Sequence, residues 1–275
     1  MNDLARYRQA VGFLDSLLNL PENSEKKNIY QAERMGWFLD FLKFPQKRLK
    51  IIHVAGTAGK GTTVHYLHEI LRAAGKRVGS YYSPHPTTAI ERIRVGDYYI
   101  SPGEFADLIE ELKPFLDKAA AVSPFGRLTY FEVFLAAGLF YFVRKKCEYA
   151  IIETGIGGRR DATNVFKNPL VCAITNVDFD HTEILGRSLK KIANEKIGIL
   201  KKKTSFFTTE KRPEILWIFQ KESETLDCPF NLVSGGNGEL AAAIADFLKI
   251  GEKAIAAGLA KNRFVCRFEE IQKKP

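Results

Sequence analysis

The hydrophobic pattern divides most of the chain into short apolar runs and longer segments with helical periodicity. The apolar runs predict strands, and they read LKIIHVA, KRVGSYYS, EYAIIET, LVCAITNV and TSFFTT. The segments between them predict helices over 62–74, 101–120, 128–146 and the stretch ANEKIGIL. Strands that alternate with helices predict an α/β fold, in which a mainly parallel β-sheet carries helices on both faces.

Both ends of the chain and one internal hairpin depart from this alternation. The opening residues, MNDLARYRQAVGFLDSLLNL, predict an amphipathic helix. Alternating residues around Gly96-Asp97, in IERIRVGDYYIS, predict a β-hairpin. From about residue 210 the pattern is mainly helical, through RPEILWIFQKES, NGELAAAIADFLKI and GEKAIAAGLA, and no further sheet is expected.

Composition indicates a soluble cytoplasmic protein. The 275 residues are 45% hydrophobic and 27% charged, and no apolar leader follows Met1. The longest apolar stretch, FEVFLAAGLFYFV, is too short to span a bilayer and contains Glu132, so no membrane association is expected. The four cysteines form no C-x-x-C pair and are expected to be reduced thiols; they are Cys147, Cys172, Cys228 and Cys266.

The net charge of +9 raises the question of a nucleic-acid partner. The basic residues are dispersed, apart from Lys190-Lys191 and Lys201–Lys203, and aromatic residues do not interleave them. A solvated basic face is therefore expected, and no nucleic acid. The alternative is a small anionic substrate that the positive field attracts.

The stretch HVAGTAGKGTTV has the features of a phosphate-binding loop, because it follows a predicted strand and opens a predicted helix. It does not match G-x-x-x-x-G-K-[ST], since Val54 and Gly61 stand at two required positions. Its glycines nevertheless allow close backbone approach to a phosphate, Lys60 supplies a cation, and Thr62 offers a hydroxyl to Mg²⁺. A plain strand–turn–helix junction would need only one glycine. The prediction is a P-loop-type ATP site.

Two further segments place polar side chains at the carboxyl ends of predicted strands. Glu153 ends the strand EYAIIET, and Asp180-His181 follows the next strand. A lone loop histidine is usually structural, but a carboxylate and a histidine beside a phosphate loop favour metal binding at the ligand crevice of a parallel sheet.

These segments together resemble the folylpolyglutamate synthase/dihydrofolate synthase branch of the Mur ligase superfamily. The resemblance rests on HVAGTAGKGTTV, SPHPTTAIERIRVGDYYIS, TYFEVFLAAGLFYF, IIETGIGGRRDATNVF, ITNVDFDHTEILGRSLKKIANEKIGILKK and the weaker NGELAAAI. It implies a ligase that uses ATP and Mg²⁺ to join L-glutamate to a folate or pteroate carboxylate through an acyl phosphate.

The resemblance also implies roles for individual residues. One Mg²⁺ would be held by Thr62, Ser83 and Glu153, and a second by Glu153, His181 and a carbamylated Lys196; an ordinary helix-surface lysine is the alternative for Lys196. The catalytic set is Lys60, Glu153, His181 and Lys196. The residues that would bind the nucleotide are Gly56, Thr57, Ala58, Gly59, Lys60, Gly61, Thr62, Thr63, Asn237 and Arg267. The residues that would bind the folate substrate, here called the folate side, are Ser83, Pro84, His85, Thr88 and Arg92.

The sequence also departs from the family's pattern. The family continues into a second α/β domain, has a longer segment between Lys203 and Asn237, and carries His-Gln before that asparagine. Residues 1–275 are therefore expected to form one Mur ligase-type ATP-binding domain, a monomer with a helical tail segment from about residue 210 and without the second α/β domain. Such a domain is expected to bind Mg·ATP and to ligate undetectably slowly.

Three alternatives stay open from the residues. One is a nucleotide-binding module without ligase activity, and another is a P-loop kinase or NTPase acting on a different acid. The third is another Mur-type amide ligase. The choice between dihydropteroate and a reduced folate also stays open.

Overall fold

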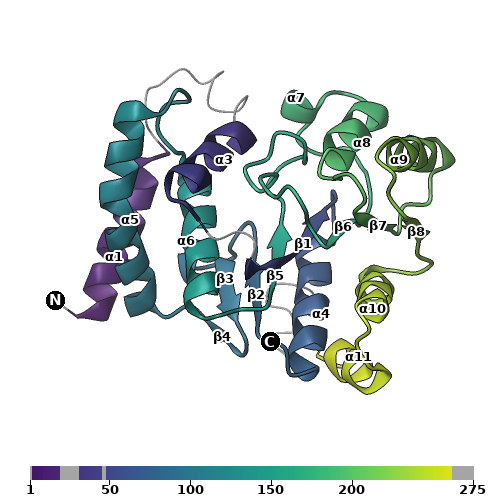
Figure 1. Cartoon of the computed structure of the whole chain (residues 1–275), viewed down its shortest axis with the longest axis horizontal. Coiled ribbons are helices and arrows are strands. Elements are labelled where there is room, and N and C mark those ends of the chain that lie inside the picture. Colours follow the sequence, from purple (N-terminus) through teal and green to yellow (C-terminus); the bar gives the residue numbers. More distant parts are fainter. Residues whose placement is uncertain (1, 19–30, 45–47, 262–275) are drawn as a thin grey trace, which may run out of the picture.

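The computed structural model describes residues 2–18, 31–44 and 48–261. At its centre lies an eight-stranded sheet with the order β4-β3-β2-β5-β1-β6-β7-β8 (Figure 1). The strands are β1 Lys50–Ala55, β2 Val78–Tyr81, β3 Ile93–Val95, β4 Tyr98–Tyr99, β5 Tyr149–Glu153, β6 Val171–Ile174, β7 Ser205–Thr208 and β8 Phe230–Leu232. All neighbouring pairs are parallel except those that β3 makes with β2 and β4.

The strand order reverses around β1. From β1 the chain moves outward to β2, and later crosses from β5 on one side of β1 to β6 on the other. Val54 of β1 stands in register with Glu153 of β5 and with Ala173 of β6. The carboxyl ends of these three strands therefore meet at the point where an open α/β sheet forms a ligand crevice.

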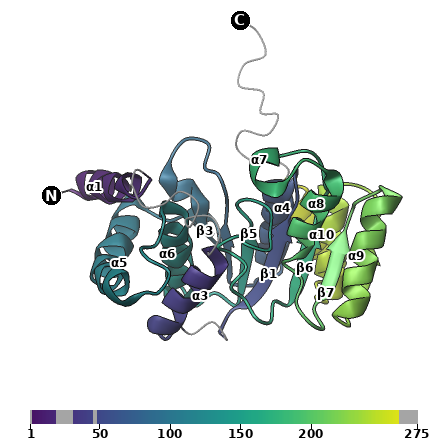
Figure 2. The same ribbon diagram turned by 90° about the horizontal axis from the view of Figure 1, so that it is seen from above.

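Helices cover both faces of the sheet, as the alternation of strands and helices predicts. One face buries Ile51 and Ile152 against α1 Asp3–Ser16, α3 Gln31–Phe41, α5 Pro102–Val122 and α6 Tyr130–Arg144. Further along the same face, Cys172 and Phe206 pack beneath α8 Leu189–Ile197 and α9 Pro213–Thr225. Figure 2 shows these two helix groups at opposite ends of the sheet.

The other face carries α4 Lys60–Ala73, α10 Asn237–Phe247 and α11 Glu252–Leu259. Val54 and Ile151 bury their side chains there together with Val64, Leu67 and Ile244. In Figure 1, α10 and α11 lie beside α4 at the lower right. Two short elements complete the chain: the 3-10 helix η2, Ala89–Arg92, and the helix α7, Thr182–Leu185.

Capping residues fix where several helices begin. Ser101 and Glu104 form a capping box at the start of α5, where Pro102 takes a position that needs no backbone N–H. Thr129 and Glu132 form another at the start of α6. The Ser188 hydroxyl accepts a hydrogen bond from the Lys191 backbone N–H at 3.3 Å and so begins α8, the helix that carries Lys196.

The predicted strands, helices and hairpin are confirmed, with shifts of a few residues at their ends. The expectation that no strand follows β7 is wrong, because β8 adds a short parallel strand at the sheet edge. Its three residues are half-buried or exposed, which leaves little hydrophobic signal. The helices after residue 210 also pack closely: a Cβ at Gly258 of α11 would lie 2.5 Å from the Ile70 Cα of α4.

The apolar helices and the cysteines can be compared with their sequence-based expectations. Among the described residues, no helix is long and apolar enough to cross a membrane. Cys147, Cys172 and Cys228 are free and buried, as expected for reduced thiols, whereas Cys266 lies outside the described residues.

Candidate nucleotide and metal site

The loop between β1 and α4 takes a conformation that requires its glycines. Gly56 has φ of 149° and Gly59 has φ of 81°, values that favour glycine over residues with a side chain. A Cβ at Gly56 would lie 1.8 Å from the Thr175 hydroxyl oxygen, so no side chain fits there. The loop therefore lies directly against the segment that follows β6.

Hydrogen bonds from that segment hold the loop in shape. The backbone N–H groups of Thr57 and Ala58 donate to the Asn176 carbonyl at 3.0 Å and to its side-chain oxygen at 2.9 Å. The Thr175 hydroxyl donates to the Ala58 carbonyl at 2.6 Å. The Thr57 hydroxyl also donates to the Asp178 carbonyl at 3.1 Å. The loop conformation is thus held by hydrogen bonds within the chain itself.

Lys60 lies folded over this loop at the first residue of α4. Its ammonium donates to the Gly56 carbonyl at 3.1 Å and to the Thr57 carbonyl at 3.4 Å. Gly61 and Thr63 are buried behind it, and Thr62 is half-buried in the first helical turn. An uncapped helix N-terminus with a lysine held above it is an anion site, because backbone N–H groups and the helix dipole both favour negative charge.

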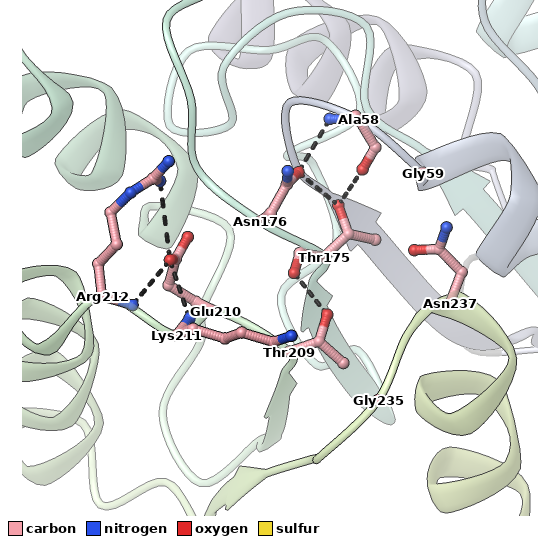
Figure 3. A pocket seen from close by; sticks show the side chains of 10 residues that line it. All are labelled: Ala58, Gly59, Thr175, Asn176, Thr209, Glu210, Lys211, Arg212, Gly235 and Asn237. Atoms are coloured by element: carbon pink, nitrogen blue, oxygen red, sulfur yellow. Dashed lines mark hydrogen bonds and ion pairs between the residues drawn. The ribbon is translucent and has the colours of Figure 1, made fainter.

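A pocket of about 390 Å³ opens beside the loop. Figure 3 shows it between the loop, the ends of β6 and β7, and the start of α10. The Glu210 carboxylate stiffens one wall, because it accepts hydrogen bonds from the backbone N–H groups of Val177 at 2.7 Å and of Arg212 at 3.0 Å. The lining residues are Ala58, Gly59, Thr175, Asn176, Thr209, Glu210, Lys211, Arg212, Gly235 and Asn237.

Asn237, a residue that the sequence predicts for nucleotide binding, lies directly beside the loop. A Cβ at Gly59 would be 2.4 Å from the Asn237 side-chain oxygen, and the Thr63 hydroxyl donates to that oxygen at 3.4 Å. The other pocket walls, Thr175, Asn176 and Thr209–Arg212, are absent from the sequence-based prediction. Their signal was the polar stretch that directly follows each of two buried strands.

Glu153 ends β5 beside the loop and is only 4% exposed. Its carboxylate accepts a hydrogen bond from the Ser83 backbone N–H at 3.1 Å. Ser83 follows β2, the next strand of the sheet, so the structure brings two of the predicted metal ligands together.

Lys196 faces the same region from α8, and the alternative of an ordinary helix-surface lysine is wrong. Its side chain is 1% exposed. Its pKa is lowered to about 8, mainly by burial and in addition by the nearby Lys60 ammonium, while the Asp180 and Asp161 carboxylates act in the opposite direction. A buried lysine with a depressed pKa next to a phosphate loop is a functional candidate.

His181 directly precedes α7 as its N-cap residue and has a left-handed backbone, at φ of 44°. Its side chain is 42% exposed, and its ring nitrogens lie 3.5 Å from the Asp180 carboxylate and 3.7 Å from the Glu183 carboxylate. Within the described ranges, no group of three or more histidine, cysteine, aspartate or glutamate side chains is arranged to hold a metal ion. A metal would therefore need hydroxyl oxygens, a modified lysine or ligand oxygens as well.

The residues predicted for the folate side form a second cluster around Arg92. This side chain is 6% exposed; its Nε donates to His85 Nδ1 at 2.8 Å and its Nη1 to the Ser83 hydroxyl at 3.4 Å. The guanidinium also stands 5.0 Å from the ring centre of Phe134 and 5.7 Å from that of Tyr130. Burial and the Arg92 charge lower the His85 pKa, which favours the neutral imidazole.

The remaining predicted residues are less closely involved. The Thr88 hydroxyl lies 2.6 Å from the Tyr7 hydroxyl of α1, and Pro84 is exposed. Arg267 lies outside the described residues.

Comparison with known proteins gives a consistent set of relatives, although no family model matches. The chain is 39% identical over 198 residues to the dihydrofolate synthase/folylpolyglutamate synthase of Bacillus subtilis, covering 72% of this chain and 46% of that protein. It is 32% identical over 269 residues to a folylpolyglutamate synthase of Arabidopsis thaliana, covering 96% of this chain and 43% of that protein. The chain thus spans about half the length of these curated relatives.

Solved structures share the fold. The folylpolyglutamate synthase of Thermotoga maritima superposes with a TM-score of 0.82 at 28% identity, over 96% of this chain and 68% of that one. E. coli FolC in complex with DHPP and ADP gives the same TM-score of 0.82 and identity of 28%, over 96% and 68% of the two chains.

Proposed function

The chain belongs to the folylpolyglutamate synthase/dihydrofolate synthase family, and from this premise we propose that it acts in the ATP-dependent ligation of L-glutamate to a folate-type acid. The observation that carries the proposal is the convergence of three elements at the strand-order reversal. These are the glycine loop with Lys60, the buried Glu153 carboxylate and the buried Lys196 amine. These groups could bind a phosphate, a metal cation and a carboxylic acid at one place.

The reaction has two steps. A carboxylate oxygen of the acid attacks the γ-phosphorus of ATP, which forms an acyl phosphate and releases ADP. The amino nitrogen of glutamate then attacks the acyl carbon, phosphate leaves, and the nitrogen loses a proton to give the amide. Two anions must meet in the first step, so positive charge and fixed hydrogen-bond donors are the main requirement.

The nucleotide phosphates fit the loop of residues 56–61 and the first turn of α4. Lys60 already reaches across the loop to the Gly56 carbonyl, and a terminal phosphate would replace that carbonyl as its partner. The adjoining pocket of about 390 Å³ would hold the nucleoside. The E. coli relative is described in complex with ADP, which supports a nucleotide in this chain as well.

Mg²⁺ fits part of the predicted ligand set as it stands. Thr62 and Ser83 offer hydroxyl oxygens and Glu153 a carboxylate, and oxygen is the ligand that Mg²⁺ prefers. His181 offers a ring nitrogen from the other side of the loop. When bound, the ion would neutralise charge on the phosphates during transfer.

Lys196 does not fit a metal as an ammonium, because it would repel the ion. With a pKa of about 8, roughly a tenth of the amine is neutral at pH 7, whereas an ordinary lysine is almost wholly protonated. A neutral amine nitrogen can attack the carbon of CO₂ and lose a proton, and the resulting carbamate presents carboxylate oxygens. We propose this modification for Lys196, with the second metal bound by the carbamate, Glu153 and His181.

The acid substrate is proposed to enter beside the Arg92 cluster. The Arg92 guanidinium is a buried cation surrounded by aromatic rings, and its partners His85 and Ser83 are neutral. Such a site suits a flat heteroaromatic acid with negative charge. Dihydropteroate and reduced folates both meet this description, and the E. coli relative in complex with DHPP supports the class.

The proposal is tested by mass spectrometry of the products. The purified chain is incubated with dihydropteroate, L-glutamate and Mg·ATP, and each component is omitted in turn. A glutamylated product that requires all three and is lost in Glu153→Gln supports the ligase, since this change keeps the shape of the side chain and removes its charge. A product that persists in Glu153→Gln would contradict the role of Glu153.

A second candidate is nucleotide binding without ligation. It is favoured by the glycine loop of residues 56–61 and the adjoining pocket of about 390 Å³, which offer a nucleotide site that needs neither the acid nor glutamate. The same experiment separates the two: Mg·ATP binding without any glutamylated product supports this candidate. Absence of both binding and product would overturn both.

A further inference from the structure

A groove of about 650 Å³ opens between α8 and α9. Lys190 and Asn194 of α8 line one wall, and side chains of α9 line the other. Figure 2 shows α9 as the outermost helix at its end of the sheet. The groove shares no lining residue with the nucleotide pocket, so the proposed ligation does not account for it.

The helix α9 has one face in the core and another along this groove. Ile215 and Phe219 are buried in the cluster beneath the helix. Trp217, by contrast, is 61% exposed and lines the groove beside Ile218. Burying a tryptophan removes about 150–250 Å² from water, and tryptophan is enriched among the residues that dominate interface energies. Trp217 is therefore a candidate anchor for a macromolecular partner.

The charges along the groove are balanced in sign. Two lysines, Lys190 and Lys221, line it together with two glutamates, Glu214 and Glu222. In the part of the chain that the structure describes, none of these four side chains forms an ion pair. A nucleic acid would meet the two carboxylates, and a strongly acidic or basic peptide would meet two like charges. A surface with both signs suits a second copy of itself.

The order of the groove residues along α9 is symmetric about the middle of the helix. Glu214 stands three positions before Trp217, and Lys221 stands three positions after Ile218. Two copies of α9 that pack antiparallel about a two-fold axis near Trp217 and Ile218 would place each Glu214 opposite Lys221 of the second copy. Each tryptophan would then face an isoleucine, and every contact would form twice, as in any isologous interface.

We infer that the groove face of α9, defined as Glu214, Trp217, Ile218 and Lys221, is a self-association surface that binds the same face of a second copy of this chain. The tryptophans supply apolar area, and the Glu214–Lys221 pairs fix the antiparallel direction. One pair of helices makes a small interface, so the chain remains the monomer that its sequence predicts at micromolar concentration and dimerises at about 0.1 mM.

The first test is analytical ultracentrifugation of the purified chain from about 10 μM to 0.5 mM. Trp217→Ala is expected to raise the dissociation constant of the dimer by at least about tenfold, because it removes the anchor. Tyr98→Ala is the matched control, since Tyr98 is an aromatic residue that is 79% exposed on β4, at the opposite edge of the sheet. It is expected to leave the dissociation constant unchanged.

The second test uses charge reversal. Glu214→Lys alone and Lys221→Glu alone each set like charges against each other across the two-fold axis, and each is expected to raise the dissociation constant by at least about tenfold. An equimolar mixture of these two variants should dimerise again, because the positive face of one then meets the negative face of the other. The double change Glu214→Lys with Lys221→Glu keeps both signs and should dimerise as the wild type does.

The outcomes decide the inference in either direction. A wild-type chain that stays monomeric up to about 0.5 mM overturns it. So does a mixture of the two charge variants that associates no better than its components, or a dimer that is unchanged by Trp217→Ala. Circular dichroism checks that each variant folds. If Trp217→Ala does not, the charge variants carry the test, since Glu214 and Lys221 are both exposed.

Discussion

Replacing Lys196 by methionine should stabilise the protein at pH 7 and lose that advantage as the pH rises. The wild-type lysine is 1% exposed and its pKa is lowered from 10.5 to about 8, mainly by burial. At pH 7 the lysine is protonated in both the folded and the unfolded chain, so folding must bury a charged ammonium. Methionine has a similar length without the charge, and it avoids that cost.

The sign of the pH dependence follows from proton binding. Between pH 8 and 10.5 the unfolded chain keeps its lysine proton and the folded chain has released it, so the Lys196 contribution to stability rises with pH across this window. The shift of 10.5 to about 8 corresponds to about 3 kcal/mol, taking 1.36 kcal/mol for each pKa unit. The stability difference between Lys196→Met and wild type should therefore shrink by up to about 3 kcal/mol from pH 7 to 10.5.

The assay is urea unfolding of both proteins at intervals of pH, in CO₂-free buffer with a chelator so that neither carbamate nor metal contributes. Lys196→Arg serves as the control, because its guanidinium stays charged throughout this range; its stability relative to Lys196→Met should stay constant from pH 7 to 10.5, since neither side chain titrates there. Buried tyrosines and cysteines also titrate above pH 9, but they are common to all three proteins and cancel in the differences. A Lys196→Met difference that is constant from pH 7 to 10.5 would refute the depressed pKa.

Two further predictions use close approaches and buried charge. Gly59→Ala should weaken ADP binding, measured by titration, because the added Cβ would stand 2.4 Å from the Asn237 side chain. Gly75→Ala is the control, since Gly75 has a similar φ of 72° and nothing lies within 4 Å of an added Cβ. It should cost similar stability and leave the ADP affinity unchanged. Arg34→Met should destabilise the fold by about 3–5 kcal/mol in urea unfolding, because it leaves the Glu132 carboxylate buried without the guanidinium that now lies 2.9 Å away. The double change Arg34→Met with Glu132→Gln should recover much of that loss, and no recovery would contradict the charge-burial explanation.

The elements that the sequence predicted well are those with local signals. The buried strands appear as apolar runs, and the loop of residues 56–61 appears as three glycines around a lysine. Positive φ at Gly56 and Gly59 explains why those positions cannot vary freely. The capping residues Ser101 and Thr129 likewise mark helix starts by residue type alone.

What the sequence did not reveal depends on segments that are distant along the chain. The pocket wall near Glu210 forms because β7 lies beside β6, and nothing in TTEKR indicates that its carboxylate accepts the Val177 N–H. The helix sequence LKKIANEKI does not predict that Lys196 is buried, nor that Gly158 packs so close to α8 that a Cβ there would stand 2.7 Å from the Lys196 backbone oxygen. Asp161 stands in the motif IIETGIGGRRDATNVF, but its hydrogen bonds with Ile156 and Thr163 depend on the three-dimensional course of the loop.

The same reasoning explains the weaker sequence-based assignments. The segment SPHPTTAIERIRV implies a place for Thr88 near the folate substrate, and its hydroxyl lies 2.6 Å from that of Tyr7 of α1, eighty-one positions away. The strand β8 and the helix α3 were not predicted, because a three-residue edge strand and a short helix carry little periodic signal. Tertiary packing determines whether such elements form, and the local sequence pattern does not predict that packing.

The central claim is that residues 56–62 hold the phosphates of Mg·ATP, and isothermal titration calorimetry of the wild-type chain and Lys60→Ala tests it most directly. We expect the wild-type chain to bind Mg·ATP and Lys60→Ala to lose binding at micromolar ATP, since a charge-assisted contact contributes about 1.5–3 kcal/mol. Circular dichroism and thermal unfolding should show an intact fold in the variant, because the substitution buries nothing new. Equal affinity in the two proteins, or no binding by the wild-type chain, would contradict the phosphate-loop assignment.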